Sequence, residues 1–207
     1  MASRFASHLK LWFFVVPLLT VAILPAIPDD GLFNIGAPET QSASIALGAD
    51  RANEAMTVTN RHFRTWFIDT GYVGKSFAGI ASNEFERHAD AGVSELGATW
   101  VKHLWLLVFR ALYRLNVLSA WMCGLCIFAG AMWMDGAARR KIKASAAGYS
   151  SPLSFHVAWH GLFLATGALI WLLLAPVPLI FNFASLFVAL FGALIWKAAE
   201  SYRSTGT

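Results

Sequence analysis

The stretch that decides the fold is residues 155–196, FHVAWHGLFLATGALIWLLLAPVPLIFNFASLFVALFGALIW. It holds two apolar runs, Phe155–Ala175 and Leu179–Trp196, and neither contains Asp, Glu, Lys or Arg. Each run is long enough to cross a bilayer. Only Pro176-Val177-Pro178 separates them. Because proline stops a helix and restricts the residue before it, this tripeptide predicts a tight reversal between two antiparallel membrane helices.

Two further apolar runs precede this hairpin. The first, Leu11–Ile27, follows Arg4 and Lys10 and contains Pro17 and Pro25. This layout resembles a signal peptide, but the length of the run, its internal prolines and the lack of a small-residue exit site favour an uncleaved anchor.

The second run, Val117–Met134, follows a stretch, Trp100–Asn116, that is apolar but carries Lys102, His103, Arg110 and Arg114. At 100° per residue, Lys102, Arg110 and Arg114 fall on one side of a helix. We therefore expect one long helix whose first half lies near the outer membrane interface and whose second half spans the bilayer.

Composition supports the same fold class. Of 207 residues, 57% are hydrophobic and 14% are charged, and the mean hydropathy is +0.55. Soluble domains carry about 25% charged residues. The prediction is an all-α polytopic membrane protein with about four transmembrane helices plus a small helical extracytoplasmic segment. The net charge of +4 is explained by basic loops that hold the cytoplasmic side, so no direct nucleic-acid binding is expected.

The basic residues near the span ends predict the topology. With four spans, both termini lie in the cytoplasm, on the side of Arg139, Arg140, Lys141 and Lys143. Arg110 and Arg114 would lie on the opposite side, and their environment stays open. The expected segments are a cytoplasmic start and first span (1–27), an extracytoplasmic helical segment (28–99), a long helix with the second span (100–134), a basic cytoplasmic loop (135–154), a helical hairpin (155–198) and a cytoplasmic tail (199–207).

The extracytoplasmic segment divides by composition. Residues 28–43 are rich in Pro, Gly and polar side chains, which predicts a loop. Ser44–Thr70 has helical periodicity that Gly71 and Gly74 interrupt, and a shorter helical stretch is expected over 77–93. Such a subdomain is either a cap on the membrane helices or a docking surface for another envelope protein.

Small residues within the second span predict helix packing. The motif Cys123-Gly-Leu-Cys126 has redox spacing, but a thiolate is disfavoured inside a hydrocarbon-buried helix. Small residues four apart let membrane helices approach closely. The residues expected at such contacts are Ala120, Cys123, Gly124, Cys126 and Gly130.

Catalytic signatures are missing from the chain. It has no GxxxxGK[ST], no HExxH and no GxSxG, so an enzyme is not expected. His156 and His160 lie one helical turn apart and are the candidates for a metal site, which would need more ligands. No cofactor is expected.

The basic stretch beside the bilayer has three readings. Arg139, Arg140, Lys141 and Lys143, followed by Tyr149, set the topology, contact anionic lipids or dock an acidic partner. The three readings do not exclude one another.

The layout resembles a family of membrane proteins encoded in bacterial integrating conjugative elements and large conjugative plasmids. The likeness rests on one N-terminal span, a helical outer segment, and the stretch RRKIKASAAGYSSPLSFHVAWH (residues 139–160) before a closing hairpin. It implies a subunit of a conjugative type IV secretion apparatus in the inner membrane, near the coupling ATPase. The resemblance supplies no catalytic residues.

The hypothesis is therefore an accessory or scaffold subunit that acts through contacts with other membrane subunits, with homo-oligomers left open. The alternative is a small transporter or channel subunit that uses Arg110, Arg114, Asn182, His156 or His160. A membrane enzyme with the two histidines as metal ligands is a third reading. The scarcity of ionisable groups in the last two spans disfavours transport.

Overall fold

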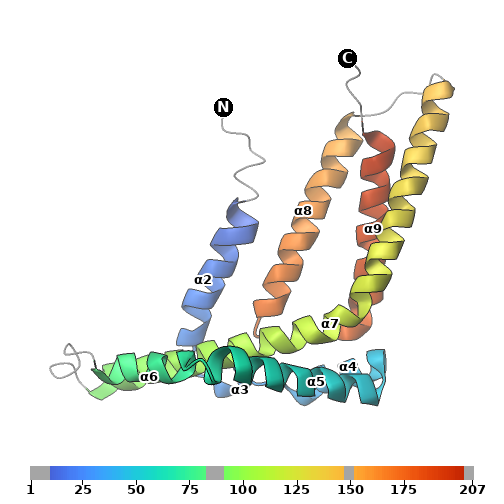
Figure 1. Cartoon of the computed structure of the whole chain (residues 1–207). Coiled ribbons are helices and arrows are strands. Elements are labelled where there is room, and N and C mark those ends of the chain that lie inside the picture. Colours follow the sequence, from blue (N-terminus) through green and yellow to red (C-terminus); the bar gives the residue numbers. More distant parts are fainter. Residues whose placement is uncertain (1–9, 83–90, 147–151, 203–207) are drawn as a thin grey trace, which may run out of the picture. The chain divides into compact units, whose positions relative to one another are not determined.

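A computed structural model describes residues 10–82, 91–146 and 152–202 (Figure 1). These residues form helices joined by short connections and include no strand, which confirms the predicted all-α class for the described part. The chain divides into two compact units. Unit 1 comprises residues 1–118 and 170–182, and unit 2 comprises residues 119–169 and 183–207.

The N-terminal apolar run is helical within unit 1. A π-helical turn, Leu11–Val15 (η1), leads into α2, Val16–Ile23, and a 3₁₀ turn, Leu24–Ala26 (η2), ends it. Pro17 stands in the first turn of α2, where a missing N–H is tolerated. The apolar helix Leu11–Ala26 is shorter than the other apolar helices.

The expected loop over 28–43 is corrected, because two helices begin there. α3, Asp30–Phe33, starts at Asp29, whose side chain accepts a hydrogen bond from the Gly31 N–H at 2.8 Å. α4, Ala37–Leu47, has Pro38 in its first turn. Pro38 thus marks the start of a helix here rather than a loop.

Three elements follow α4 in unit 1: α5, Ala49–Phe63, the π-helical turn Arg64–Ile68 (η3) and α6, Tyr72–Ser82. The breaks fall at two glycines with positive φ, Gly48 (87°) and Gly71 (79°), a conformation that side chains rarely adopt. Gly74, the other expected break, lies inside α6. The expected stretch 77–93 is helical to Ser82 and again from Ala91, and residues between lie outside the described part.

The long helix predicted over 100–134 is present and extends further. α7 runs from Ala91 to Ser145 and contributes to both units. The predicted loop over 135–154 is corrected accordingly, because the chain is helical to Ser145 and again from Pro152. Asp135–Ser145 contains no Pro and only one Gly, so nothing local ends the helix.

The hairpin consists of α8, Pro152–Leu174, and α9, Ala184–Ser201. Residues 175–180 form the reversal, and a 3₁₀ turn, Phe181–Phe183 (η5), precedes α9. The second helix therefore begins later than the expected Leu179 and ends later than the expected 198. Three helical segments are long and apolar enough to cross a membrane: Glu95–Ser145, Leu153–Leu174 and Phe181–Ser201.

Helices of unit 2 meet through glycine residues. A Cβ atom on Gly136 of α7 would lie 2.5 Å from the Trp196 carbonyl oxygen of α9, and one on Gly192 of α9 would lie 2.2 Å from the Phe128 ring. Gly161 of α8 faces Leu194 of α9 in the same way. Close approach of backbones through glycine is a common means of packing membrane helices.

The residues predicted for helix packing lie elsewhere. Ala120, Cys123, Gly124, Cys126 and Gly130 are exposed. No described atom lies within 4 Å of a Cβ placed on Gly124 or Gly130. These residues therefore do not join helices within the described chain, and their packing against other chains stays a prediction.

Candidate functional site: a buried carboxylate between two arginines

The site lies along one stripe of α7 in unit 1. Apolar members of the stripe, Leu107, Tyr113 and Val117, are at most 1% exposed. Two arginines share this burial, because Arg110 is 2% exposed and Arg114 is fully buried. Charged side chains are rarely buried without partners, so these two require an anion and acceptors nearby.

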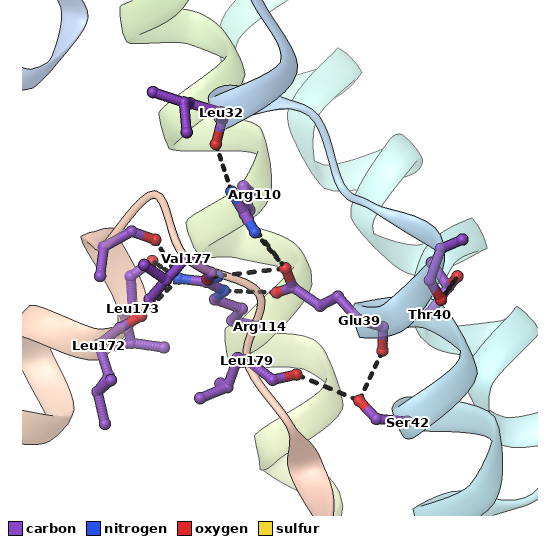
Figure 2. A network of polar contacts seen from close by, with 12 residues as sticks. Leu32, Glu39, Thr40, Ser42, Arg110, Arg114, Leu172, Leu173, Val177 and Leu179 are labelled. Atoms are coloured by element: carbon purple, nitrogen blue, oxygen red, sulfur yellow. Dashed lines mark hydrogen bonds and ion pairs between the residues drawn. The ribbon is translucent and has the colours of Figure 1, made fainter.

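Glu39 is the anion. It lies in the first turn of α4 and its side chain is fully buried. The N-terminal end of a helix favours negative charge, so the position suits a carboxylate. Figure 2 shows Glu39 pointing between the two arginines.

The two arginines bind both carboxylate oxygens of Glu39. Arg110 donates from Nε and Nη2 to Oε2 at 3.0 and 2.6 Å. Arg114 donates from Nε to Oε1 at 2.6 Å and from Nη2 to Oε2 at 3.2 Å. Charge-assisted hydrogen bonds of this kind are about twice as strong as neutral ones.

Arg114 also caps the C-terminal end of α8. Its Nη1 donates to the carbonyl oxygens of Leu172, Leu173 and Ala175 at 2.5, 3.3 and 2.8 Å, and its Nη2 donates to that of Val177 (Figure 2). The last carbonyls of a helix have no intrahelical donor and carry partial negative charge. The buried guanidinium of Arg114 supplies both the hydrogen-bond donors and the positive charge.

The prolines of the reversal remove backbone donors at the end of α8, and Arg114 supplies the donor that the Leu172 carbonyl then lacks. In a continuing helix the N–H groups of residues 176 and 178 would bind the carbonyls of residues 172 and 174. Pro176 and Pro178 have no N–H. The reversal and the buried arginine thus complement each other.

Other donors on α7 bind other helix ends in unit 1. Arg110 donates from Nη1 to the Leu32 carbonyl of α3 at 2.6 Å, and Trp100 donates from Nε1 to the Ala22 carbonyl of α2 at 3.1 Å. A ring nitrogen of His103 lies 3.0 Å from the Pro25 carbonyl oxygen. One face of α7 therefore binds the ends of α2, α3 and α8.

Asp30 completes the contacts of α3 with α7. His103 Nε2 lies 2.7 Å from one carboxylate oxygen, Lys102 Nζ lies 2.5 Å from the other, and the His103 ring stacks on Phe33 with centroids 4.5 Å apart. Hydrogen bonds from Lys102 and then from His103 hold the pKa of the Asp30 carboxyl below its ordinary value.

Ser42 ties α4 to the chain just after the reversal. Its hydroxyl contacts the Leu179 carbonyl oxygen at 3.2 Å and accepts a hydrogen bond from the Phe181 N–H at 3.3 Å (Figure 2). The Phe181 ring meets Tyr113 of α7 edge to face, with centroids 6.4 Å apart. The segment 170–182 therefore belongs to unit 1 although its neighbours in sequence lie in unit 2.

The arrangement is suited to holding helices and not to exchanging charge. Every buried side-chain nitrogen and oxygen in the described residues has a hydrogen-bond partner. The Glu39 carboxylate is bound by two guanidinium groups, which do not give up protons at physiological pH. Removing one member would leave uncompensated charge in the interior, which is strongly destabilising.

The predicted basic contact residues divide by their surroundings in unit 2. Arg139 Nε lies 3.4 Å from Asp135 Oδ2, and its Cζ lies 5.0 Å from the centroid of the Trp196 ring. Lys143 forms an ion pair with Glu200. Arg140 lies 5.4 Å above the Tyr202 ring, and Lys141 is exposed. Tyr149 lies outside the described residues.

The candidate metal ligands, His156 and His160, are exposed on α8. His156 meets Phe155 with ring centroids 5.8 Å apart. Within residues 10–82, 91–146 and 152–202, no group of three or more His, Cys, Asp or Glu side chains could hold a metal ion. No described acidic or thiol ligand therefore joins the histidine pair.

Sequence reasoning missed Glu39 and the carbonyl acceptors. A signal for them existed, because Arg110 and Arg114 stand four residues apart in an otherwise apolar stretch. Two cations on one buried face require a counter-charge. The outer segment offers several acidic residues, and nothing in the sequence selects Glu39 among them.

A family model described as "IncC plasmid conjugative DNA transfer protein DtrJ-like" matches residues 36–203. The chain therefore belongs to the DtrJ-like family of conjugative DNA transfer proteins, which confirms the predicted relation to conjugative elements. No curated protein and no solved structure matches the chain. The matched range includes Glu39, both arginines and the proline reversal.

Proposed function

We propose that this DtrJ-like protein is an accessory or scaffold subunit of a conjugative type IV secretion system in the bacterial inner membrane. It spans the membrane four times, with both termini in the cytoplasm, and associates with the coupling ATPase that delivers DNA to the channel. It acts by binding other subunits and not by catalysis.

Support comes first from the apolar surface of unit 2. Few residues in the three candidate spans are buried within the chain. Large side chains such as Ile127, Met134 and Leu186 are 70%, 73% and 67% exposed. Lipid or the helices of other subunits would cover these faces in a membrane.

The small-residue face of α7 is the part of this surface best suited to another helix. Gly124 and Gly130 have open space around them, so a neighbouring backbone can come close. Contacts there would leave the packing of α7 with α9 through Gly136 undisturbed. The face thus offers an intermolecular contact separate from the internal one.

Further support comes from the arginines proposed for transport. Arg110 and Arg114 are held by Glu39 and by backbone carbonyls in unit 1. Ionisable groups on a transport pathway face a water-filled cavity or the pathway itself, and both of these side chains are buried among protein acceptors. The observation favours the scaffold over a transporter or channel subunit.

The test is co-purification from the native host, with a C-terminal tag and gentle extraction. We expect the coupling ATPase to co-purify with the native chain. The double variant Gly124→Leu/Gly130→Leu fills the open face and should reduce the captured ATPase and the frequency of DNA transfer. Since a Cβ placed at either position meets no described atom within 4 Å outside its own stretch of helix, the variant should keep its fold.

The matched control is Gly124→Ala/Gly130→Ala, which keeps small side chains and should retain the ATPase. A chain that purifies alone, as a discrete oligomer without secretion components, would contradict the proposal. Ion flux by the reconstituted chain that requires Arg110 would instead establish the transporter alternative.

A further inference from the structure

The part of α7 in unit 2 has two distinct faces. One face binds α9: Gly136 contacts the α9 backbone, Arg139 lies over Trp196, and Lys143 pairs with Glu200. Glu200 is 4% exposed and is also bound by Lys197 at 2.7 Å. Two cations of the basic stretch are therefore engaged within the chain.

The other face is exposed and changes from apolar to basic along its length. Ile127, Met134 and Lys141 follow one another at intervals of seven residues, which places them on one line along a helix. The first two are 70% and 73% exposed. A neighbouring line, Cys126, Trp133 and Arg140, repeats the pattern with Trp133 50% exposed.

The change occurs where the bilayer boundary would fall. The Trp196 indole of α9 donates to Asp135 of α7 at 2.6 Å, so the first charged residue after the apolar run stands level with a tryptophan. Tryptophan collects at the headgroup level of membranes. Lys141 lies about 10 Å beyond Met134 at 1.5 Å per residue. Its flexible side chain can reach back to the phosphate layer.

Lys141, which is exposed, and Arg140, which is half-buried, keep donors available for a ligand. Among the described residues Lys141 has no hydrogen bond or ion pair, and Arg140 makes only its ring contact with Tyr202. No carboxylate of the described chain neutralises either one. In contrast, Asp135 and Glu200 partly neutralise Arg139 and Lys143.

We propose that this face binds an anionic phospholipid. The acyl chains lie along Ile127, Trp133 and Met134, and the phosphate lies between the Arg140 guanidinium and the Lys141 ammonium. An apolar strip that ends in two cations without a carboxylate partner in the described residues matches a lipid better than it matches a protein. The acyl chains would meet the apolar side chains, and the phosphate would meet the cations, along one helix. The inference rests on the proposed membrane insertion but not on any protein partner.

The test measures binding of phosphatidylglycerol to the purified full-length chain in detergent, by native mass spectrometry and by thermal shift, with phosphatidylcholine as the neutral lipid. We expect phosphatidylglycerol to remain bound and to raise the melting temperature, and phosphatidylcholine to do neither. The double variant Arg140→Gln/Lys141→Gln should bind phosphatidylglycerol on the order of 10- to 30-fold more weakly.

The matched control, Arg139→Gln/Lys143→Gln, removes the same charge from the α9-binding face. It should lower the melting temperature without lipid, yet keep the affinity for phosphatidylglycerol within about threefold. Equal loss in both variants would overturn the proposal, because net charge alone would then explain binding. Unchanged lipid affinity of Arg140→Gln/Lys141→Gln would overturn it too. The same holds if this variant keeps its lipid and loses only the binding of an acidic protein. The lipid experiment uses the purified chain alone, so a failure of the lipid proposal can be distinguished from a failure of the proposed binding to the coupling ATPase.

Discussion

Units 1 and 2 hold their helices together by different means. In unit 1, four donors on α7 bind carbonyl groups where α2, α3 and α8 end, and the fully buried Glu39 lies among them. In unit 2, helices meet along their sides, with glycine at the closest points. The comparison teaches that the position of helix ends decides which kind of contact a unit needs.

The physical reason is the state of the backbone. Along the middle of a helix every N–H and C=O is paired, so a neighbour has only to fit. At a helix end the last carbonyls are unpaired, and burying them requires outside donors. Unit 1 gathers several ends around one helix, and the segment 170–182 brings two prolines that remove further donors.

The largest effect should come from Glu39→Gln. The change leaves Arg110 and Arg114 buried side by side without a counter-charge, and we expect a loss of about 3–5 kcal/mol in the free energy of unfolding. Thermal and chemical unfolding of the purified chain measures it. Glu54→Gln, on the exposed side of α5, is the control and should change stability by less than about 0.5 kcal/mol. Equal effects of the two variants would show that the network does not hold unit 1.

Arg114→Lys sharpens the comparison because it keeps the positive charge and removes the several N–H donors of the guanidinium group. A lysine ammonium has three donors on one atom and cannot serve Glu39 and the carbonyls of residues 172–177 together. We expect a loss of about 2–3 kcal/mol. Faster amide hydrogen exchange over α4 and the end of α8 should accompany it. Unchanged exchange there would argue against the capping role.

Gly136→Ala tests the close fit of α7 and α9 in unit 2. The added methyl would overlap the Trp196 carbonyl of α9, and we expect a loss of about 1–3 kcal/mol. The control, Gly124→Ala, meets no described atom and replaces glycine inside a helix, so it should stabilise by up to about 1 kcal/mol. The two melting temperatures should therefore move in opposite directions. A shift in the same direction would contradict the close contact.

The smallest effect should be the acid sensitivity of Asp30. Its pKa in the folded chain lies below the ordinary 3.8, so its contacts with Lys102 and His103 stabilise the fold above pH 3.8. That contribution is lost as the pH falls through the lowered value. The stability difference between the native chain and Asp30→Asn should shrink as the pH falls below 3.8. Asp50→Asn controls for the removed charge, and a difference that does not vary with pH would contradict the linkage.

The all-α class and the candidate membrane spans could be predicted from the sequence because they depend on local properties. The apolar runs, the prolines at 176 and 178 and the basic residues beside the runs each act within a few residues of themselves. The continuous helix through Trp100–Met134 followed from the placement of Lys102, Arg110 and Arg114 on one side of a helix. Loop boundaries were less predictable, because residues typical of loops stand inside helices. Pro38 lies in the first turn of α4, and Gly136 lies within α7 where it contacts α9.

The sequence by itself determined that this chain is helical and apolar, with basic residues beside its apolar runs, because hydropathy, proline and charge act locally. It also placed Arg110 and Arg114 on one face of a helix and left their partners open. Only the tertiary structure decided that Glu39, 71 positions before Arg110, is their counter-charge. It also decided that Arg139 and Lys143 contact α9 and that Arg140 lies over Tyr202 at the end of α9. Such pairings join segments far apart in the chain, so they depend on how helix ends meet in space, which no local pattern encodes.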